Sequence, residues 1–281
     1  MPDLNDPPRE LASTYLKFAG FWPAGPKLQR ALLDFTSRQP VLSTGAAAWM
    51  KSFARAFVPM SHNLFRGLNA AAMFAQSLPA NLREVGSDLK IMEIIEIGRE
   101  EGIGLYGAPR ASLVRRLQNA PDVAARRRLL GTEARNIFDD CDAVLEQTTP
   151  PKLGFAVVMV RDAIAAARDG HWISAQAGAT AALDGAARTV LADKRIREAV
   201  TRTGRITRRD ETVFDEFKVI QAIALMPVYG AHPNYRYDDI VPSNYSRHAT
   251  AHSAARRQFS KRNTVQAILV TTSLLAWVDD L

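Results

Sequence analysis

Cysteine is almost absent from this chain of 281 residues, in which Cys141 is the single one. A lone thiol excludes an internal disulfide and any metal site built from several thiolates. It also fits a reducing compartment, where disulfides are rare. We expect Cys141 to be a small buried side chain.

Long apolar runs are lacking as well. The most apolar stretch, 265–278, is interrupted by Gln266 and by the run Thr271-Thr272-Ser273, so no segment reaches the roughly 18 uninterrupted apolar residues of a membrane span. Residues 1–9 hold two aspartates and three prolines, whereas a signal peptide needs a basic start and an apolar block. The sequence therefore predicts a cytoplasmic protein that does not enter a membrane. One alternative stays open, because 46–82 mixes apolar and basic residues as membrane-surface helices do, although core-facing helices show this pattern more often.

Motifs for nucleotides and catalytic metals are missing too. Gly102, Gly104 and Gly107 follow a predicted helix rather than a strand, so we do not expect them to form a phosphate-binding loop. The chain contains no Gly-Lys-Ser/Thr and no His-Glu-x-x-His. We therefore predict that the protein uses no cofactor and no metal ion.

Helical periodicity dominates the chain, and no segment alternates apolar and polar residues as a half-buried strand does. The predicted fold class is all-α. One apolar stripe predicts a helix that ends before Pro150, and a second predicts a helix closed by Gly170. The stripes are Leu130, Ala134, Ile137, Cys141 and Val144, and then Leu153, Val157, Val160 and Ile164.

A further helix is predicted over 171–191, directly after the short Asp169-Gly170 joint. So short a joint implies an antiparallel hairpin with the preceding helix. The predicted buried face is rich in small residues, which permits a neighbouring helix to approach closely. The face consists of Ala175, Ala177, Gly178, Ala179, Ala181 and Ala182.

The last third of the chain changes character several times. The basic stretch 195–209 is predicted to be a loop, 213–224 a helix that ends near Pro227, and 230–243 a turn-rich segment. A short helix is predicted to start near Ser243 or Asn244, followed by a final helix over 261–278 with Ser260 as its N-cap. Because the final helix is apolar nearly all round, we expect it at the centre of a bundle. Two domains are expected: a helical N-terminal region, 1–150, and a helical bundle, 151–281.

Positive charge is concentrated late in the chain, whose formal net charge is +7. The segment 195–262 contains thirteen basic and seven acidic residues. This excess favours a phosphate-bearing partner, although a solvated, salt-bridged surface gives the same count.

Two of the five histidines lie with an arginine in the segment Arg247-His248-Ala249-Thr250-Ala251-His252. The segment opens a short helix after an irregular loop, and a basic turn and the apolar final helix follow it. This arrangement resembles the HEPN superfamily, whose members carry Arg-x4-to-6-His near the start of a late helix in a four- or five-helix bundle. His248 has the polar place that often follows the arginine in this family. The segment 244–252, with Asn263 opening the last helix, is also similar to an Asn-Arg-His-x3-His-Gly pattern of bacterial HEPN-like proteins.

The chain departs from that pattern at three positions. Ser246 stands where the pattern has Asn, and Ser253 stands where it has Gly. Ala254 stands where one toxin branch has a tyrosine that is a target of modification. The resemblance extends over 152–281 at most.

The resemblance implies metal-independent RNA cleavage that leaves 2′,3′-cyclic phosphate ends, in a toxin or a phage-defence protein. Arg247 would hold the phosphate, and His252 would move the proton of the 2′-hydroxyl or of the leaving oxygen. These two residues are about 140° apart on an ideal helix, so they share a pocket only if Arg247 lies in a loose first turn. In the family, dimerisation brings two Arg/His pairs into one cleft, and we therefore expect a homodimer.

Supporting roles are predicted for His248, Asn263 and Asp184. Asp184 lies in an otherwise apolar stretch, where it either orients Arg247 or faces solvent. RNA contacts are predicted for nearby basic residues and for two tyrosines that could stack on bases or simply anchor their loop. These residues are Arg256, Arg257, Lys261, Arg262, Tyr235 and Tyr237.

Besides a small-molecule or nucleotide binder between the helices, which has no dedicated sequence signal, three alternatives to a ribonuclease stay open. The first is a non-catalytic HEPN-like module that binds RNA or a protein, which the departures at Ser246 and Ser253 favour. The second is a metal pair on His248 and His252, one helical turn apart, which needs a third ligand such as His232 or Asp184. The third is that the motif side chains only satisfy buried polar groups at a helix contact.

Overall fold

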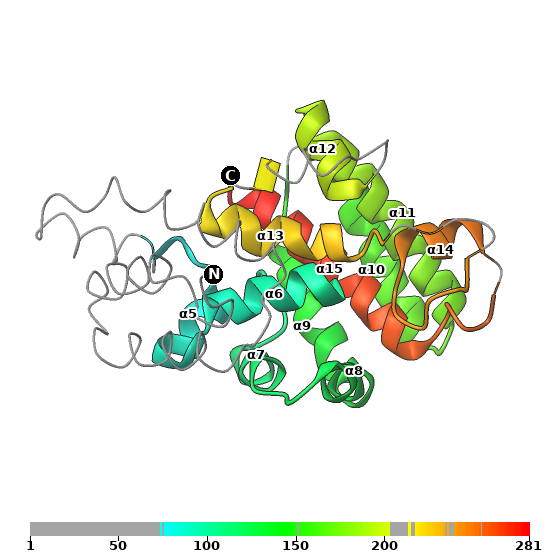
Figure 1. The fold of residues 1–281 in the computed structure, drawn as a ribbon, viewed down its shortest axis with the longest axis horizontal. Helices are drawn as coiled ribbons and strands as arrows, with labels where there is room; N and C mark the ends of the chain where they lie inside the picture. Colours follow the sequence, from blue (N-terminus) through cyan, green and yellow to red (C-terminus); the bar gives the residue numbers. More distant parts are fainter. Residues whose placement is uncertain are drawn as a thin grey trace, which may run out of the picture. The chain divides into compact units, whose positions relative to one another are not determined.

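A computed structural model describes residues 74, 76–150, 152–202, 213–214, 217–233, 235, 239–253 and 255–281. These residues form eleven α-helices, one short 3-10 helix and no strand (Figure 1), which confirms the all-α class. The helices are α5 (Ala80–Val85), η2 (Gly86–Asp88), α6 (Ile91–Glu101), α7 (Ala111–Gln118), α8 (Val123–Thr132), α9 (Ala134–Gln147), α10 (Gly154–Arg168), α11 (Trp172–Val190), α12 (Lys194–Thr201), α13 (Val219–Gly230), α14 (Arg247–His252) and α15 (Lys261–Asp279).

The chain divides into two compact units, Met1–Leu78 with Glu211–Val219, and Pro79–Asp210 with Ile220–Leu281. The second unit holds all but a few of the described residues. Within it α8 and α9 pack against α15, so residues on both sides of position 150 share one core. This division differs from the domain boundary at residue 150 that the sequence suggested. The segment 46–82, considered above as a membrane-surface helix, lies mostly outside the described residues, and none of the described helices is long and apolar enough to cross a membrane.

Helix α15 is the central element of the larger unit. Every side chain from Asn263 to Trp277 is buried, and α8, α9, α10 and α11 all pack against this helix. Ser260 is its N-cap and accepts a hydrogen bond from the Asn263 backbone N–H at 3.3 Å. The predicted last helix, its N-cap and its central position are therefore confirmed.

Buried polar side chains of α15 tie it to its neighbours. Thr264 donates to the Trp172 carbonyl and Thr271 to the Ala179 carbonyl, each at 3.1 Å, which holds α11. Gln266 donates to the Glu101 carbonyl at the end of α6. Because each of these groups has a backbone partner, their burial carries no penalty for lost hydration.

The glycine-rich turn after α6 is buried against α15. Its spacing is Gly-x-Gly-x-x-Gly, but it follows helix α6 rather than a strand. A Cβ on Gly104 would lie 2.8 Å from the Val270 Cα, and Ser273 Oγ accepts from the Tyr106 backbone N–H at 3.1 Å. The absence of a side chain at Gly104 therefore allows close packing on α15.

Helices α10 and α11 form the predicted hairpin and lie side by side (Figure 1). Gly170 has a φ of +84° at their joint, a left-handed conformation that suits glycine. Ala175, Ala179 and Ala182 are buried as predicted. Ala177 and Ala181, which were assigned to the same face, are exposed instead, because they lie on the side of α11 that turns away from α10 and α15.

Several predicted boundaries were wrong, and the helix predicted over 213–224 runs instead as α13 from Val219 to Gly230, past Pro227. The stripe from Leu130 to Val144 crosses a break at Glu133, whose carboxylate binds Arg116 at 2.7 Å, so Leu130 belongs to α8 and the rest to α9. In α9 Leu145 is buried where Val144 was expected, and Cys141 is fully buried. Burial raises the pKa of the Cys141 thiol to about 12, so the thiol is protonated at neutral pH.

The basic stretch that starts at Arg195 was predicted to be a loop, but its first part is helix α12. The Asp193 side chain caps this helix by accepting from the backbone N–H groups of Arg195 and Ile196. Ala199 and Val200 bury its apolar side. The capping aspartate is the sequence signal that was overlooked.

Candidate functional site at helix α14

The predicted motif forms the six-residue helix α14, which begins at Arg247. Ser246 is the N-cap and accepts from the Ala249 backbone N–H at 3.2 Å. The helix starts later than predicted, at Arg247. Tyr245, which precedes the cap, is held in the core, where its hydroxyl lies 3.0 Å from Thr180 Oγ1 of α11. Arg247 therefore occupies the first turn, as a shared pocket with His252 requires.

Arg247 is anchored to α11 by an ion pair with Asp184. Its Nη2 donates to Asp184 Oδ2 at 2.5 Å, and the two side chains are 12% and 24% exposed. The Arg247 backbone N–H also donates to the Ala231 carbonyl at 2.8 Å. Arg247 Nε is buried without a hydrogen-bond partner. Asp184 thus contacts the arginine that it was expected to orient.

His248 lies directly beside the guanidinium. Its Nδ1 is 3.2 Å from Arg247 Nη1, and because arginine can only donate, Nδ1 accepts and the ring proton is on Nε2. Burial, and then the positive charge of Arg247, lower the pKa of His248, while a hydrogen bond with the Thr201 backbone opposes that shift. His248 therefore accepts from the guanidinium through Nδ1, and its ring is also hydrogen-bonded to the Thr201 backbone.

His252 is the exposed member of the group. Its ring stacks on that of His248, with centroids 6.5 Å apart and an interplanar angle of 18°. The contacts therefore run in a row from Asp184 through Arg247 and His248 to His252. The arginine meets His248 directly, and His252 is one ring further out.

His232 lies two residues after the end of α13 and contacts His248. It is fully buried, its Nδ1 lies 2.6 Å from the Val228 carbonyl, and its Nε2 has no hydrogen-bond partner. Its ring meets that of His248 edge-on at a centroid distance of 5.6 Å. Burial lowers the pKa of His232 to about 4. We name the five residues Asp184, His232, Arg247, His248 and His252 the α14 corner.

The sequence offered His232 only as a metal ligand. Within the described part of the chain, no group of three or more His, Cys, Asp or Glu side chains is arranged to hold a metal ion. The engaged nitrogens of His248 also oppose a metal pair with His252. His232 instead acts as a buried, neutral neighbour of His248.

Gln258 is a structural residue that the sequence gave no reason to single out. Its Oε1 accepts from the Ser246 backbone N–H at 2.9 Å, and its Nε2 donates to the carbonyls of Pro242 and Asn244 at 3.1 Å each. It is fully buried. A neutral glutamine in a polar turn carries no local pattern, yet this side chain holds the loop that positions Arg247.

Asn263 supports the same loop rather than the arginine. Its Nδ2 donates to the Gln258 carbonyl at 2.6 Å, and its Oδ1 accepts from Arg127 Nη2 at 3.3 Å. Asn263 therefore acts on the site through Gln258 and does not contact Arg247.

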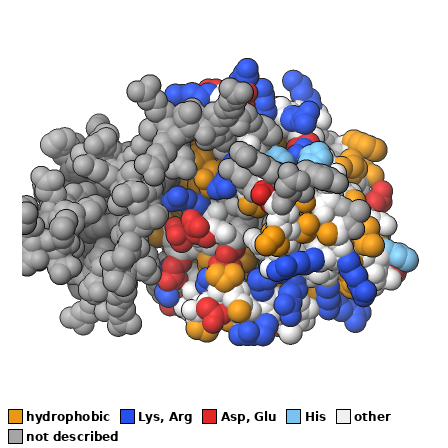
Figure 2. All heavy atoms as spheres, turned by 45° about the vertical axis from the view of Figure 1, so that its right-hand side comes forward, with side chains coloured by type: hydrophobic (Ala, Val, Ile, Leu, Met, Phe, Trp, Pro, Cys, Tyr) orange, Lys and Arg blue, Asp and Glu red, His pale blue; other side chains and the backbone are white. Residues whose placement is uncertain are grey.

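The predicted RNA contacts are largely at the surface. Arg256, Arg257, Lys261 and Arg262 are exposed, and Tyr235 is half-buried. Tyr237 lies outside the described residues. Figure 2 shows histidines at the surface of this face and, lower down, a concentration of Lys and Arg side chains.

No protein-family model, curated protein or solved structure matches the chain. The resemblance to the HEPN superfamily therefore rests on the sequence motif alone. Chemically, the α14 corner offers solvent an imidazole, with a guanidinium that carries unused N–H groups one ring away. Such a pair can bind an anionic group and exchange a proton with it.

Proposed function

We propose that this protein is a metal-independent endoribonuclease of the HEPN type, acting in the manner of a toxin or phage-defence effector. The observation that carries the proposal is the row of contacts Asp184–Arg247–His248–His252, which passes from a half-buried ion pair to an exposed imidazole. Arginine and histidine are the residue types that cleave RNA without a metal, since one holds the phosphate and the other moves protons.

The proposed roles follow from the free atoms of each side chain. Arg247 uses one N–H of Nη2 on Asp184 and one of Nη1 on His248, which leaves a second N–H on each terminal nitrogen for the phosphate oxygens. His252 takes the proton of the 2′-hydroxyl, and the 2′-oxygen attacks the adjacent phosphorus. The bond from phosphorus to the 5′-oxygen then breaks, which leaves a 2′,3′-cyclic phosphate and, after protonation of the leaving oxygen, a 5′-hydroxyl.

This reaction needs one group to take a proton and another to give one. Each α14 corner has a single exposed histidine, because His248 and His232 are engaged or buried. A second copy of the chain would supply the second His252. A homodimer whose two α14 helices face one cleft is therefore part of the proposal.

The test uses the full-length chain, total RNA and an excess of chelator. The wild-type protein should produce fragments with 2′,3′-cyclic phosphate ends, and Arg247→Ala and His252→Ala should each reduce cleavage by about a hundredfold or more. His171→Ala is the matched control, because His171 is exposed at the start of α11 and lies outside the α14 corner. Cleavage at the wild-type rate by both motif variants would refute the proposal.

A second candidate function is a non-catalytic helical module that binds RNA or a protein partner. The close ion pair with Asp184 favours it, since a carboxylate beside Arg247 partly neutralises the charge that a phosphate would meet. RNA binding by the wild-type protein without any cleavage, in the same experiment, would support this module over the nuclease.

A further inference from the structure

Helix α8 and the start of α15 bring basic side chains together from distant parts of the sequence. Arg262 lies over Gly131 of α8, where an added Cβ would be 3.3 Å from its Cγ and Nε. Arg127 and Arg128 lie one turn before Gly131, on the same side of α8. Arg127 also reaches α15, because its Nη2 donates to Asn263 Oδ1 at 3.3 Å.

These arginines lack acidic partners, unlike their neighbour Arg126. Arg126 forms a 2.5 Å ion pair with Glu101. Arg127 bonds only neutral acceptors, the Ser243 carbonyl at 2.7 Å and Asn263. None of the ion pairs formed by the described residues involves the four side chains Arg127, Arg128, Lys261 and Arg262.

The positive charges are close enough to oppose each other. Burial, and then the charge of Arg262, lower the pKa of Arg127. A bound polyanion would relieve this repulsion, and the exposed side chains of Arg128, Lys261 and Arg262 can reach it.

The same surface is connected to the α14 corner through a short stretch of backbone. The carbonyl that Arg127 binds belongs to Ser243, four residues before Arg247. Gln258 holds the intervening residues by its bonds to Asn244 and Ser246. A strand lying on the basic side chains is therefore near the loop that leads to the proposed catalytic arginine.

We propose that Arg127, Arg128, Lys261 and Arg262 form a binding site for the phosphate backbone of single-stranded RNA, which we name the α8–α15 basic surface. The choice of RNA as the polyanion rests on the proposed function. Two of the four residues come from α8, which the sequence assigned to a separate N-terminal region. The site holds the substrate strand by its phosphates, and the α14 corner acts on it.

The test measures binding without cleavage. Its probe is a fluorescent single-stranded oligonucleotide with 2′-O-methyl riboses, which has no free 2′-hydroxyl to attack the phosphate. The affinity of the full-length chain for this probe is measured by fluorescence anisotropy at several salt concentrations. The test variant is the double substitution Arg128→Ala with Arg262→Ala, since both side chains are exposed.

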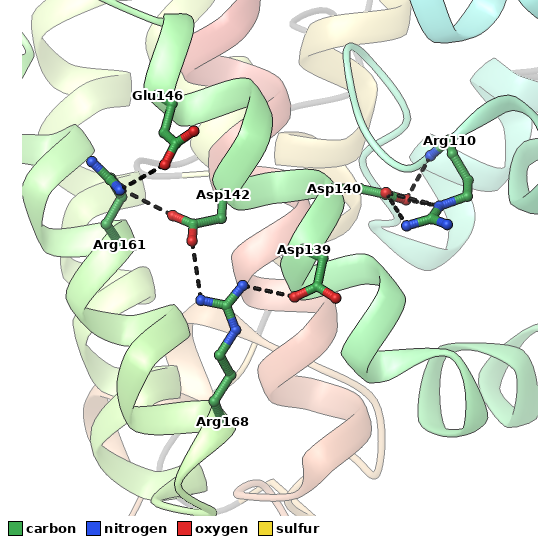
Figure 3. Close-up of polar contacts among 7 residues, drawn as sticks. All are labelled: Arg110, Asp139, Asp140, Asp142, Glu146, Arg161 and Arg168. Atoms are coloured by element: carbon green, nitrogen blue, oxygen red, sulfur yellow. Dashed lines mark hydrogen bonds and ion pairs between the residues drawn. The ribbon is translucent and has the colours of Figure 1, made fainter.

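The control variant removes the same charge from arginines that already have acidic partners. On α10, Arg161 binds Asp142 and Glu146, and Arg168 binds Asp139 and Asp142 (Figure 3). We name these five residues the α9–α10 seam. The control is Arg161→Ala with Arg168→Ala.

The test variant should bind the probe about tenfold more weakly, with a salt slope smaller by about 1.4, since each lost phosphate contact removes roughly 0.7. The control variant should keep the wild-type affinity and slope. The proposal is overturned if the test variant binds like the wild type, or if the control variant loses as much. It is also overturned if the test variant loses binding to anionic lipid vesicles but not to the oligonucleotide.

The experiments distinguish a failure of the binding site from a failure of the proposed nuclease activity. His171→Ala should bind the probe like the wild type, because His171 lies outside both the α8–α15 basic surface and the α14 corner. Weaker binding by the test variant, together with a wild-type protein that cleaves no RNA, would support the binding site and refute the nuclease.

Discussion

The α14 corner and the α9–α10 seam both join helices through arginine–carboxylate pairs, and they differ in how exposed these pairs are. In the seam, Arg161 and Arg168 each bind two carboxylates with side chains that are 45% and 39% exposed. In the corner, Arg247 is 12% exposed and binds one carboxylate. The seam arginines are exposed and each binds two carboxylates. Arg247 is more enclosed, binds one carboxylate, and has a buried Nε without a hydrogen-bond partner.

The corner contains buried polar atoms that make no hydrogen bond. Arg247 Nε and His232 Nε2 are buried polar atoms without hydrogen bonds, and such atoms are uncommon in folded proteins. The seam has no such atom. The Arg126–Glu101 ion pair has one, at Glu101 Oε2, so these atoms distinguish the corner from the seam without assigning a ligand to it. The same difference predicts that substitutions in the corner have large effects and that those in the seam have small ones.

The largest effect is expected for Gln258→Ala. The substitution removes three hydrogen bonds to the loop before α14 and leaves the buried Ser246 N–H without a partner. We expect a loss of about 4 kcal/mol in the free energy of unfolding, measured by urea denaturation. The control Gln147→Ala changes an exposed residue at the end of α9, so its effect should stay below about 0.5 kcal/mol. Similar losses for both variants would contradict the role of Gln258.

The next largest effect concerns pH and His232. Its pKa falls from 6.5 to about 4 on folding, so between these values the unfolded chain binds a proton that the folded chain does not. Stability should fall as the pH drops from 6.5 towards 4, by on the order of 3 kcal/mol from this group, and His232 should contribute no pH dependence above that range. His248, Arg247 and Asp184 face the same ring, and the lowered pKa of His248 acts in the same direction.

His232→Phe isolates the contribution of His232. Unfolding free energies of the variant and of the wild type are compared across this pH range. The variant should lose markedly less stability on acidification, whereas His171→Ala should behave like the wild type. An unchanged pH profile in His232→Phe would show that another group is responsible.

A smaller effect is expected for Asp184→Asn, which keeps the shape of the side chain and removes its charge. Arg247 then has no carboxylate partner in a half-buried place, and we expect a loss of about 2 kcal/mol, less than for a fully buried pair. RNA cleavage should fall about tenfold, because Arg247 is held less firmly. Faster cleavage would instead mean that Asp184 blocks the phosphate site, as the second candidate function implies.

The smallest effect is expected in the seam. Arg161→Ala breaks two ion pairs, but the side chain is 45% exposed, and pairs of this kind contribute less than about 1 kcal/mol. The loss should shrink further at high salt, because exposed charges are screened. Urea denaturation at two salt concentrations measures the loss in the free energy of unfolding and its decrease at high salt. A loss of stability as large as that of Gln258→Ala would contradict the expectation that substitutions in the seam have small effects.

Apolar pattern predicted the framework of the molecule well. The all-α class, the hairpin of α10 and α11, and the central α15 with its Ser260 cap were all expected, because each depends on local periodicity. Helix α12 was missed because half of its residues are charged, and its signals are the Asp193 cap and the buried apolar residues Ala199 and Val200. The break between α8 and α9 was missed because the apolar stripe continues across it.

The site was predictable only where one side chain stood out from its surroundings. Asp184 could be matched to Arg247 because it is a lone acid in an apolar stretch. The roles of Gln258, His232 and Arg127 depend on contacts between elements far apart in the sequence, which no local pattern encodes. Asn263 was given a supporting role, and its hydrogen bonds are to Gln258 and Arg127.

The most direct test of the central claim compares two substrates that differ only at the 2′-position. A pool of single-stranded RNA and its 2′-O-methyl counterpart are incubated with the wild-type protein and with His252→Ala in the presence of chelator, and the ends are identified by mass spectrometry. We predict 2′,3′-cyclic phosphate ends from the RNA pool with the wild-type protein alone, and no cleavage of the 2′-O-methyl pool. An intact RNA pool, or equal cleavage by His252→Ala, would contradict the account.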